Sequence, residues 1–244
     1  MLSKLYILPF LLIPTFLVAQ ITTETSFVYF DADSAPVRNL AVYNSHSEDT
    51  VLVEVEVTKI NTSGEKDAKD APTSDLIVSP KRFTMPPGTS RVSRIILRKP
   101  AGEKESAYRI NFIPRAVTDD EGKPPVTVGG RGVKLRVLTG VGAIIFAEPK
   151  DPKAILSWED KGSSMVIKNT GNINVYVDDV YSCINPDSDT TCTWIKEASK
   201  RMYPGYEKVI EKSKDKIIKI TRRVNNDSKK IILKGTGEEV IEYQ

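Results

Sequence analysis

The stretch SPKRFTMPPGTSRVSRIILRKPAGEKESAYRINF, residues 79–112, decides the fold of this chain. Pro86 and Pro87 fix φ and remove their backbone donors, and Gly88 tolerates positive φ. A strand that ends near Met85 must therefore turn at this point. The pattern predicts a β-hairpin or a turn that crosses from one sheet to another.

Further strands follow this turn. Residues 91–97 mix apolar and polar side chains, as a half-buried strand does. Alternate side chains of the next strand point to opposite faces of its sheet. The apolar face holds Tyr108, Ile110 and Phe112, and the polar face holds Arg109 and Asn111. An arginine directed out of a sheet needs a partner for its guanidinium group.

Strand patterns continue along the chain. The clearest is VLVEVEVTKI, residues 51–60, in which valines face one way and polar residues the other, so one face is buried and one meets water. Turn residues separate the strands at intervals typical of β-sandwiches. The predicted strands are 26–30, 37–43, 51–60, 76–78, 91–97, 108–113, 133–146, 154–158, 164–169, 174–181, 216–223 and 230–233.

A domain boundary is predicted within EPKDP, residues 148–152, because its prolines interrupt the pattern directly after an apolar strand. The predicted fold class is all-β, with two immunoglobulin-like β-sandwich domains in tandem. The predicted segments are a signal peptide at 1–19, an N-terminal domain at 20–149 and a C-terminal domain at 150–244.

The first residues, MLSKLYILPFLLIPTFLVAQ, have the pattern of a secretory signal peptide. Lys4 precedes an apolar run over 5–18, and small Ala19 marks the predicted cleavage site. No later run approaches the ~18 apolar residues of a membrane helix. We therefore expect an exported protein without stable membrane insertion.

Cys183 and Cys192 lie nine positions apart. In an exported chain they favour a disulfide, because the compartment is oxidising. The alternative, a metal site built on two thiols, lacks further ligands nearby.

The net charge of +3 is too mild to indicate nucleic-acid binding. The chain has no G-x-S-x-G nucleophile motif, no phosphate-binding loop and no H-E-x-x-H zinc motif. Its single histidine, His46, lies in the polar, turn-like NSHSED. The sequence thus predicts neither an enzyme nor a protein with a metal or other cofactor.

The order of these motifs resembles the PapD-like periplasmic chaperones of pilus assembly. The branch that serves CFA-type and common-pilus systems is most similar, because its members share a Tyr-Arg-aliphatic strand, here Tyr108-Arg109-Ile110. Gly171-Asn172 within NTGN, and the cysteine pair before Tyr203-Pro204, resemble the second domain of that branch.

The resemblance implies that this protein acts in the periplasm, where it stabilises pilus subunits and delivers them to an outer-membrane usher. Each subunit resembles an immunoglobulin domain without its last strand, and the chaperone lends a strand of its own. The two domains are implied to meet at an angle, with a cleft between them. Free copies with an exposed strand edge have the means to self-associate. The rival prediction is a secreted structural or adhesive protein with two such domains.

The strand that would be lent is VKLRVLTGVGAII, residues 133–145. One face of this strand is apolar almost throughout, which suits insertion into a subunit. Alternatively, the same side chains fill the core of the chain's own domain. The predicted donor residues are Val133, Leu135, Val137, Thr139 and Val141.

A carboxylate anchor is also implied. In the best-known branch, an arginine early in the first strand and a lysine on the donor strand bind the carboxylate at the subunit's C-terminus. Those positions fall near Ser26 or Phe27 and near Ile144, where this chain has no basic residue. We predict Arg109 as the substitute, because a guanidinium group binds carboxylates bidentately.

Other assignments for this anchor stay open. Arg94 and Lys134 are further candidates. Arg109 could instead pair with a neighbour such as Glu105, or remain solvated.

Overall fold

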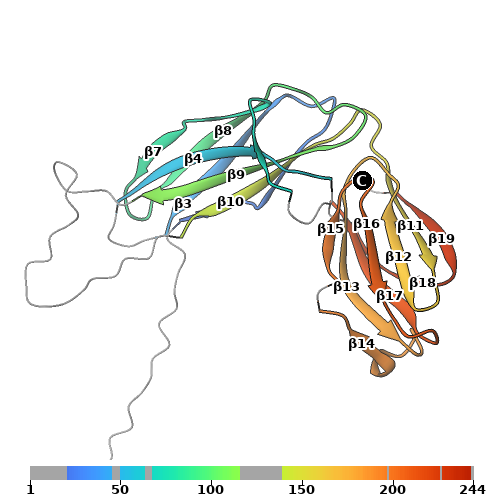
Figure 1. Ribbon diagram of the computed structural model, residues 1–244. Coiled ribbons are helices and arrows are strands. Elements are labelled where there is room, and N and C mark those ends of the chain that lie inside the picture. The colour runs from blue at the N-terminus through green and yellow to red at the C-terminus, as the bar shows by residue number, and fades with distance from the viewer. Residues whose placement is uncertain are drawn as a thin grey trace, which may run out of the picture.

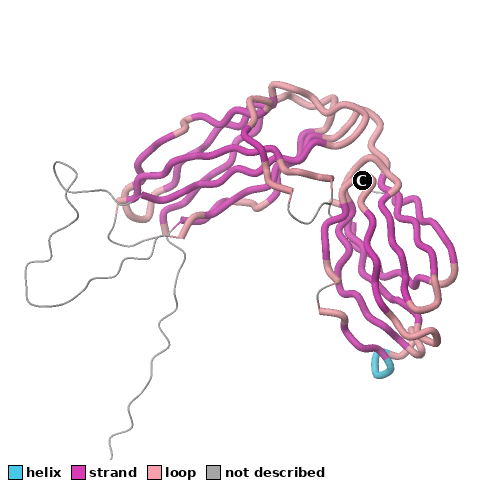
Figure 2. Tube along the Cα trace, in the orientation of Figure 1, coloured by secondary structure: helices cyan, strands magenta, loops and turns pink. Residues whose placement is uncertain are grey.

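The computed structural model describes residues 21–45, 50–63, 68–115, 139–196, 198–225 and 227–242. The predicted signal peptide, His46 and the predicted site residues Val133, Lys134, Leu135 and Val137 lie outside the described residues. The described part of the chain is almost entirely β-structure, as predicted (Figures 1 and 2). Its helical element is the short 3-10 turn η1 (Asp189–Thr191).

The first ten strands form a pair of sheets. One sheet has the order β1-β3-β8-β6, and the other has the order β2-β10-β9-β4-β5, with β7 also paired to β4. The strands are β1 (Ile21–Thr23), β2 (Phe27–Phe30), β3 (Val37–Asn44), β4 (Val51–Lys59), β5 (Ala71–Pro72), β6 (Leu76–Ser79), β7 (Arg82–Met85), β8 (Ser90–Leu97), β9 (Ser106–Arg115) and β10 (Val141–Ala147).

The remaining strands form a second pair of sheets. Their orders are β16-β12-β11-β19 and β14-β13-β17-β18, with β15 also paired to β13. The strands are β11 (Ala154–Asp160), β12 (Ser164–Asn169), β13 (Val175–Cys183), β14 (Cys192–Trp194), β15 (Lys200–Met202), β16 (Glu207–Glu211), β17 (Ile217–Val224), β18 (Asp227–Leu233) and β19 (Thr236–Ile241).

The Pro-Pro-Gly turn crosses between sheets. β7 pairs with β4, whereas β8 pairs with β3 in the opposite sheet. Gly88 has φ +65°, a conformation that favours glycine. The buried side chain of Asn44 donates hydrogen bonds of 3.1 Å to the carbonyl groups of Met85 and Pro86, which holds the turn against β3.

Each sandwich buries its own core. The predicted apolar face of β9 lies in the first core, where Tyr108, Ile110 and Phe112 are at most 1% exposed. The second core contains Leu156, Ile167 and other residues from β11 to β19. These cores confirm two tandem β-sandwiches.

The sandwiches meet at an angle (Figure 1). A small apolar cluster joins them, because Tyr203 of the second sandwich packs with Ile60, Ala107 and Phe146 of the first. Tyr29 and Ile144 complete this cluster. We call this region the junction.

Among the described residues, no helix is long and apolar enough to cross a membrane.

Candidate functional site

The edge of β10 is covered along part of its length only. Ile144 to Ala147 pair with β2 in parallel, and the Ile144 amide donates a hydrogen bond of 2.9 Å to the Ser26 carbonyl group. Before Ile144, β10 pairs with β9 alone among the described residues. Because backbone groups of a strand alternate in direction, the Gly142 N–H points to the same side as that of Ile144. No described residue therefore covers this side of the segment from Val141 to Ala143, which we call the open edge.

The inward face of β10 serves the first core. Val141, Ala143 and Ile145 all pack into it, so the alternative prediction, that these side chains fill their own domain, holds for this part of the strand. Thr139 lies just before β10 and is exposed. The outward face carries Gly142, whose missing Cβ would lie 3.1 Å from Oδ1 of Asn111.

Arg109 lies on the outward face of β9, at the junction. It pairs in register with Ile144 of β10, and Ile144 pairs in turn with Phe27 of β2. The Nε of Arg109 donates a hydrogen bond of 3.0 Å to Oδ2 of Asp70. The arginine side chain of this ion pair is 44% exposed. The predicted alternative partner, Glu105, is engaged elsewhere.

Arg94 and Arg109 are not brought together. Arg94 is exposed on β8, where it pairs in register with Asn39 and Ser79 in the sheet opposite β9 and β10.

Sequence reasoning missed Arg201, a junction cation from the second sandwich. It lies on β15, and its guanidinium carbon is 4.9 Å from the ring centroids of both Phe27 and Phe146. The ring of Tyr176 lies 5.4 Å away, and Nη1 donates to Oδ1 of Asn174. A three-residue strand such as β15 has no periodicity that a sequence could reveal.

Glu105 is buried at the junction beside this cation. Nδ2 of Asn174 donates a hydrogen bond of 2.7 Å to Oε2 of Glu105. The backbone amide of Glu105 donates a hydrogen bond of 2.9 Å to the Asn172 carbonyl group. Burial raises the pKa of Glu105 to about 8, although the hydrogen bonds from Asn174 oppose the shift. Oε1 has no hydrogen-bond partner in the described structure. Near neutral pH this carboxyl group is therefore mostly protonated.

A second carboxyl group, that of Glu148, accepts a hydrogen bond of 3.3 Å from Nδ2 of Asn225 across the junction. Burial raises the pKa of Glu148 as well. The first sandwich thus presents two carboxyl groups to amides of the second.

The NTGN motif holds the connection between the sandwiches. Asn172 accepts from the Lys153 amide and donates 2.8 Å to the Asp151 carbonyl. A Cβ on Gly171 would lie 2.2 Å from the Lys153 carbonyl oxygen, so only glycine fits. The motif therefore clamps the segment that leads into the second sandwich.

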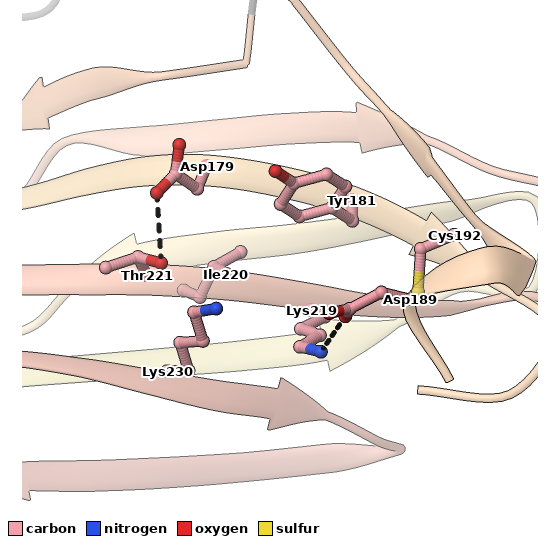
Figure 3. Close-up of a pocket in the computed structure, with 8 residues that line it drawn as sticks. All are labelled: Asp179, Tyr181, Asp189, Cys192, Lys219, Ile220, Thr221 and Lys230. Atoms are coloured by element: carbon pink, nitrogen blue, oxygen red, sulfur yellow. Dashed lines mark hydrogen bonds and ion pairs between the residues drawn. The ribbon is translucent and has the colours of Figure 1, made fainter. Parts of the chain in front are cut away.

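The disulfide between Cys183 and Cys192 is formed, as predicted. A hollow of about 160 Å³ lies beside it on the outer face of β13, β17 and β18 (Figure 3). In this hollow Lys219 donates a hydrogen bond of 2.9 Å to Asp189, and Thr221 donates one of 3.4 Å to Asp179. In the described part of the chain, no group of three or more His, Cys, Asp or Glu side chains could hold a metal ion.

Comparisons with known proteins agree with this geometry. The profile of the family described as "Pili and flagellar-assembly chaperone, PapD N-terminal domain" matches residues 20–128. The structure of the class 5 fimbriae chaperone CfaA is similar over 87% of this chain and 98% of that one, with a TM-score of 0.59 and 18% identity. The first sandwich thus matches the family of pilus-assembly chaperones, and the whole chain shares the fold of CfaA.

Other comparisons extend this similarity. One relative, a CFA/I fimbrial protein of Escherichia coli, is 27% identical over 206 residues, which cover 82% of this chain and 79% of the relative. Another, a CS1 fimbrial protein of Escherichia coli, is 27% identical over 167 residues, 66% of this chain and 68% of the relative. A chain in the structure of the Salmonella enterica SafA pilin with the SafB chaperone has a TM-score of 0.63 at 14% identity, over 88% of this chain and 97% of that one.

Proposed function

We propose that this protein is a chaperone that binds pilus subunits by adding the open edge of β10, and the segment before it, to the incomplete sandwich of a subunit. It then passes the subunit to an outer-membrane usher. The observation that carries the proposal is the uncovered edge from Val141 to Ala143 in a PapD-like fold. Such an edge is a template for pairing with another chain.

The donated face is proposed to include Val133, Leu135, Val137 and Thr139. Each buried aliphatic side chain contributes about 1.5–3 kcal/mol, whereas a net backbone hydrogen bond contributes about 0.5–1.5 kcal/mol. Side chains therefore set the affinity, and backbone pairing sets the direction of the bound strand.

Arg109 is proposed as an anchor for the subunit's terminal carboxylate. Its place on the row Arg109–Ile144–Phe27, at the junction, supports this role. Its ion pair with Asp70 is well exposed on the arginine side, and exposed pairs contribute only about 0.2–1 kcal/mol. Breaking this ion pair so that Arg109 can bind a subunit carboxylate therefore requires little free energy.

We further propose that residues 1–19 are a signal peptide and that the mature protein acts in the periplasm. Its domains are proposed to span 20–149 and 150–244. The last strand of the first sandwich ends at Ala147 and the first strand of the second begins at Ala154, which supports this boundary.

A co-purification experiment tests the proposal. The chain is co-expressed in the periplasm with the pilus subunit encoded beside it, and recovered one-to-one complex is quantified. Leu135→Asp, on the proposed donor face, should lower recovery at least about tenfold, because a buried charge opposes insertion. Arg136→Asp, on the other face, serves as the matched control and should leave recovery within about twofold. Equal recovery for both variants contradicts the proposal, and discovery of this chain within purified fibres supports the structural or adhesive alternative.

A further inference from the structure

The hollow beside the disulfide, on the outer face of β13, β17 and β18, has no part in the proposed function. It measures about 160 Å³, the liquid volume of about five water molecules. A single group the size of one six-membered ring therefore fits it. The residues that line it are Asp179, Tyr181, Asp189, Cys192, Lys219, Ile220, Thr221 and Lys230 (Figure 3).

A β-bulge in β13 builds one side of the hollow. The register of β13 against β17 shifts between Asp178 and Tyr181, so that two residues lie opposite one. Val180 is fully buried in the second core, whereas Asp179 lines the hollow. Asp179 has φ +44°, a conformation in which aspartate is commoner than most residues. The bulge thus adds a carboxylate to the outer face of the sheet, and bulges are frequent beside functional sites.

The disulfide-closed loop builds the opposite side. The bond between Cys183 and Cys192 closes this loop at its base. Lys219 ties the loop to β17, because its Nζ donates hydrogen bonds of 2.9 Å to Asp189 and 3.1 Å to the Pro186 carbonyl group. This wall of the hollow is therefore held in place before any ligand arrives.

Three polar groups at the hollow remain available to a ligand. The Tyr181 hydroxyl and the Lys230 ammonium group make no hydrogen bond or ion pair with a described residue. The Asp179 carboxylate has no ion pair in the described part of the chain, and it accepts a long hydrogen bond of 3.4 Å from Thr221. The hollow therefore offers an acceptor, a donor and a hydroxyl that can do either.

An exposed aromatic side chain lies next to the hollow. Tyr181 pairs in register with Lys219 of β17 on one side and with Trp194 of β14 on the other. Paired residues share a face of the sheet, so Trp194 extends the outer face beyond Tyr181. The Trp194 side chain is 53% exposed. Aromatic rings beside a few convergent polar groups are typical of small-ligand sites.

We propose that the hollow binds a neutral sugar unit of a glycan, and that the neighbouring unit stacks on Trp194. Sugar hydroxyl groups donate and accept, so one unit can donate to Asp179, accept from Lys230 and do either with Tyr181. The C–H face of a sugar ring packs on an aromatic ring. This inference goes beyond the proposed function, because the hollow lies on the second sandwich and the open edge on the first.

The charges of the hollow favour a neutral ligand. Asp179 and Asp189 balance Lys219 and Lys230, so an anion meets two carboxylates and a cation meets two ammonium groups. A small zwitterion such as glycine matches these charges, but it has no ring to pack on Trp194. The exposed tryptophan therefore decides in favour of the sugar.

The test is a nuclear magnetic resonance titration of the full exported protein, labelled with nitrogen-15. The probes are the linear trisaccharides of glucose and of N-acetylglucosamine. The chain has two tryptophans and hence two indole N–H signals. The Trp194 signal and the amides of Asp179 to Tyr181 should shift and saturate with at least one probe. The signal of Trp158, whose indole donates to the Lys234 carbonyl group, should stay in place.

Two matched variants locate the site. Asp179→Asn suits the positive φ and removes the charged acceptor, so the sugar should bind at least about tenfold more weakly, the size of a charge-assisted hydrogen bond. Asp178→Asn is the control, because the adjacent Asp178 pairs with Arg223 and does not line the hollow. It should leave the affinity within about twofold. Trp194→Ala should bind the trisaccharide no better than the corresponding monosaccharide.

Three results would overturn the inference. The first is the absence of saturable shifts with both trisaccharides. The second is a stronger response of the same signals to inorganic phosphate or glycine than to either sugar. The third is an equal loss of affinity in Asp178→Asn and Asp179→Asn. Recovery of the chaperone–subunit complex should stay at the wild-type level in Asp179→Asn, so failure of the sugar site leaves the proposed function standing.

Discussion

The edges of the two sandwiches differ. In the first sandwich, β10 leaves Val141–Ala143 unpaired on one side among the described residues. In the second, charged side chains join the edge strands β18 and β19, because Glu239 of β19 accepts a hydrogen bond of 3.2 Å from Lys229 of β18. Glu239 also accepts a hydrogen bond of 3.4 Å from Arg222 of the neighbouring strand β17. Edge lysines and ion pairs discourage further strand addition. The comparison teaches that the first sandwich offers an unpaired backbone edge, whereas charged side chains bridge the β18 and β19 edges of the second, which contributes side chains to the junction.

Closing the open edge should have the largest effect. Gly142→Pro removes the N–H that points out of the edge, so a partner strand loses a backbone hydrogen bond and meets the proline ring. Recovered chaperone–subunit complex should fall at least about tenfold. Gly142→Ala is the control for the added Cβ beside Asn111, and it should retain most of the complex. Equal yields for the two variants would show that the open edge is not used.

Removing the disulfide of the second sandwich should lower stability and leave subunit binding unchanged. Replacing Cys183 and Cys192 with serine removes a bond that closes a short loop, worth about 3 kcal/mol in the chain-entropy model. Urea denaturation should show this loss in the second sandwich, while complex yield per folded molecule remains close to wild type. A variant that folds normally but no longer binds subunits would show that the second sandwich contributes more than its junction side chains.

The junction between the sandwiches should respond to pH through Glu105. Its pKa is raised to about 8 in the folded state, so between about pH 5 and pH 8 the folded chain holds a proton that the unfolded chain releases. The unfolding free energy should therefore fall as pH rises, by up to about 1.4 kcal/mol per pH unit. Glu148 adds a slope of the same sign, because its pKa is also raised.

Glu105→Gln isolates the contribution of Glu105. Glutamine is uncharged at every pH and can still accept from Asn174, so the variant should lose most of the slope in urea titrations across this range. A slope equal to that of the wild-type protein would mean that Glu105 is ionised in the folded state.

The smallest effect is expected at the exposed ion pair of the junction. Asp70→Ala frees Arg109 and should cost about 0.2–1 kcal/mol of stability, because the arginine side chain of the pair is 44% exposed. If Arg109 exchanges Asp70 for a subunit carboxylate, complex yield should stay the same or rise. A clear fall in yield would indicate that Asp70 itself contacts the subunit. Asp75→Ala, which breaks the similar pair with Lys59, is the control.

Periodic strands were predictable from the sequence, and pairings set by tertiary contacts were not. The alternation in 51–60 and the Tyr108–Phe112 face correctly separate core from surface. Short edge strands such as β1, β5 and β15 have two or three residues and owe their existence to neighbours distant in sequence. Their positions carry no local signal.

The candidate site follows the same division. The strand that carries Arg109, and its outward direction, were predictable from period-two geometry. Its partner Asp70 was not, because the ion pair joins residues 39 positions apart. Arg201 was missed for a related reason: its relation to Phe27 depends on how the two sandwiches meet. The donor residues before Thr139 stay a prediction.

Amide hydrogen exchange at Gly142 tests the central claim most directly. In the free chaperone its N–H points out of an open edge and should exchange quickly, whereas the Ile144 amide, bonded to Ser26, should be protected. In the complex with a pilus subunit, the Gly142 amide should become protected by at least about tenfold, because a subunit carbonyl accepts it. Unchanged exchange at Gly142 in a saturated complex would contradict strand donation by β10.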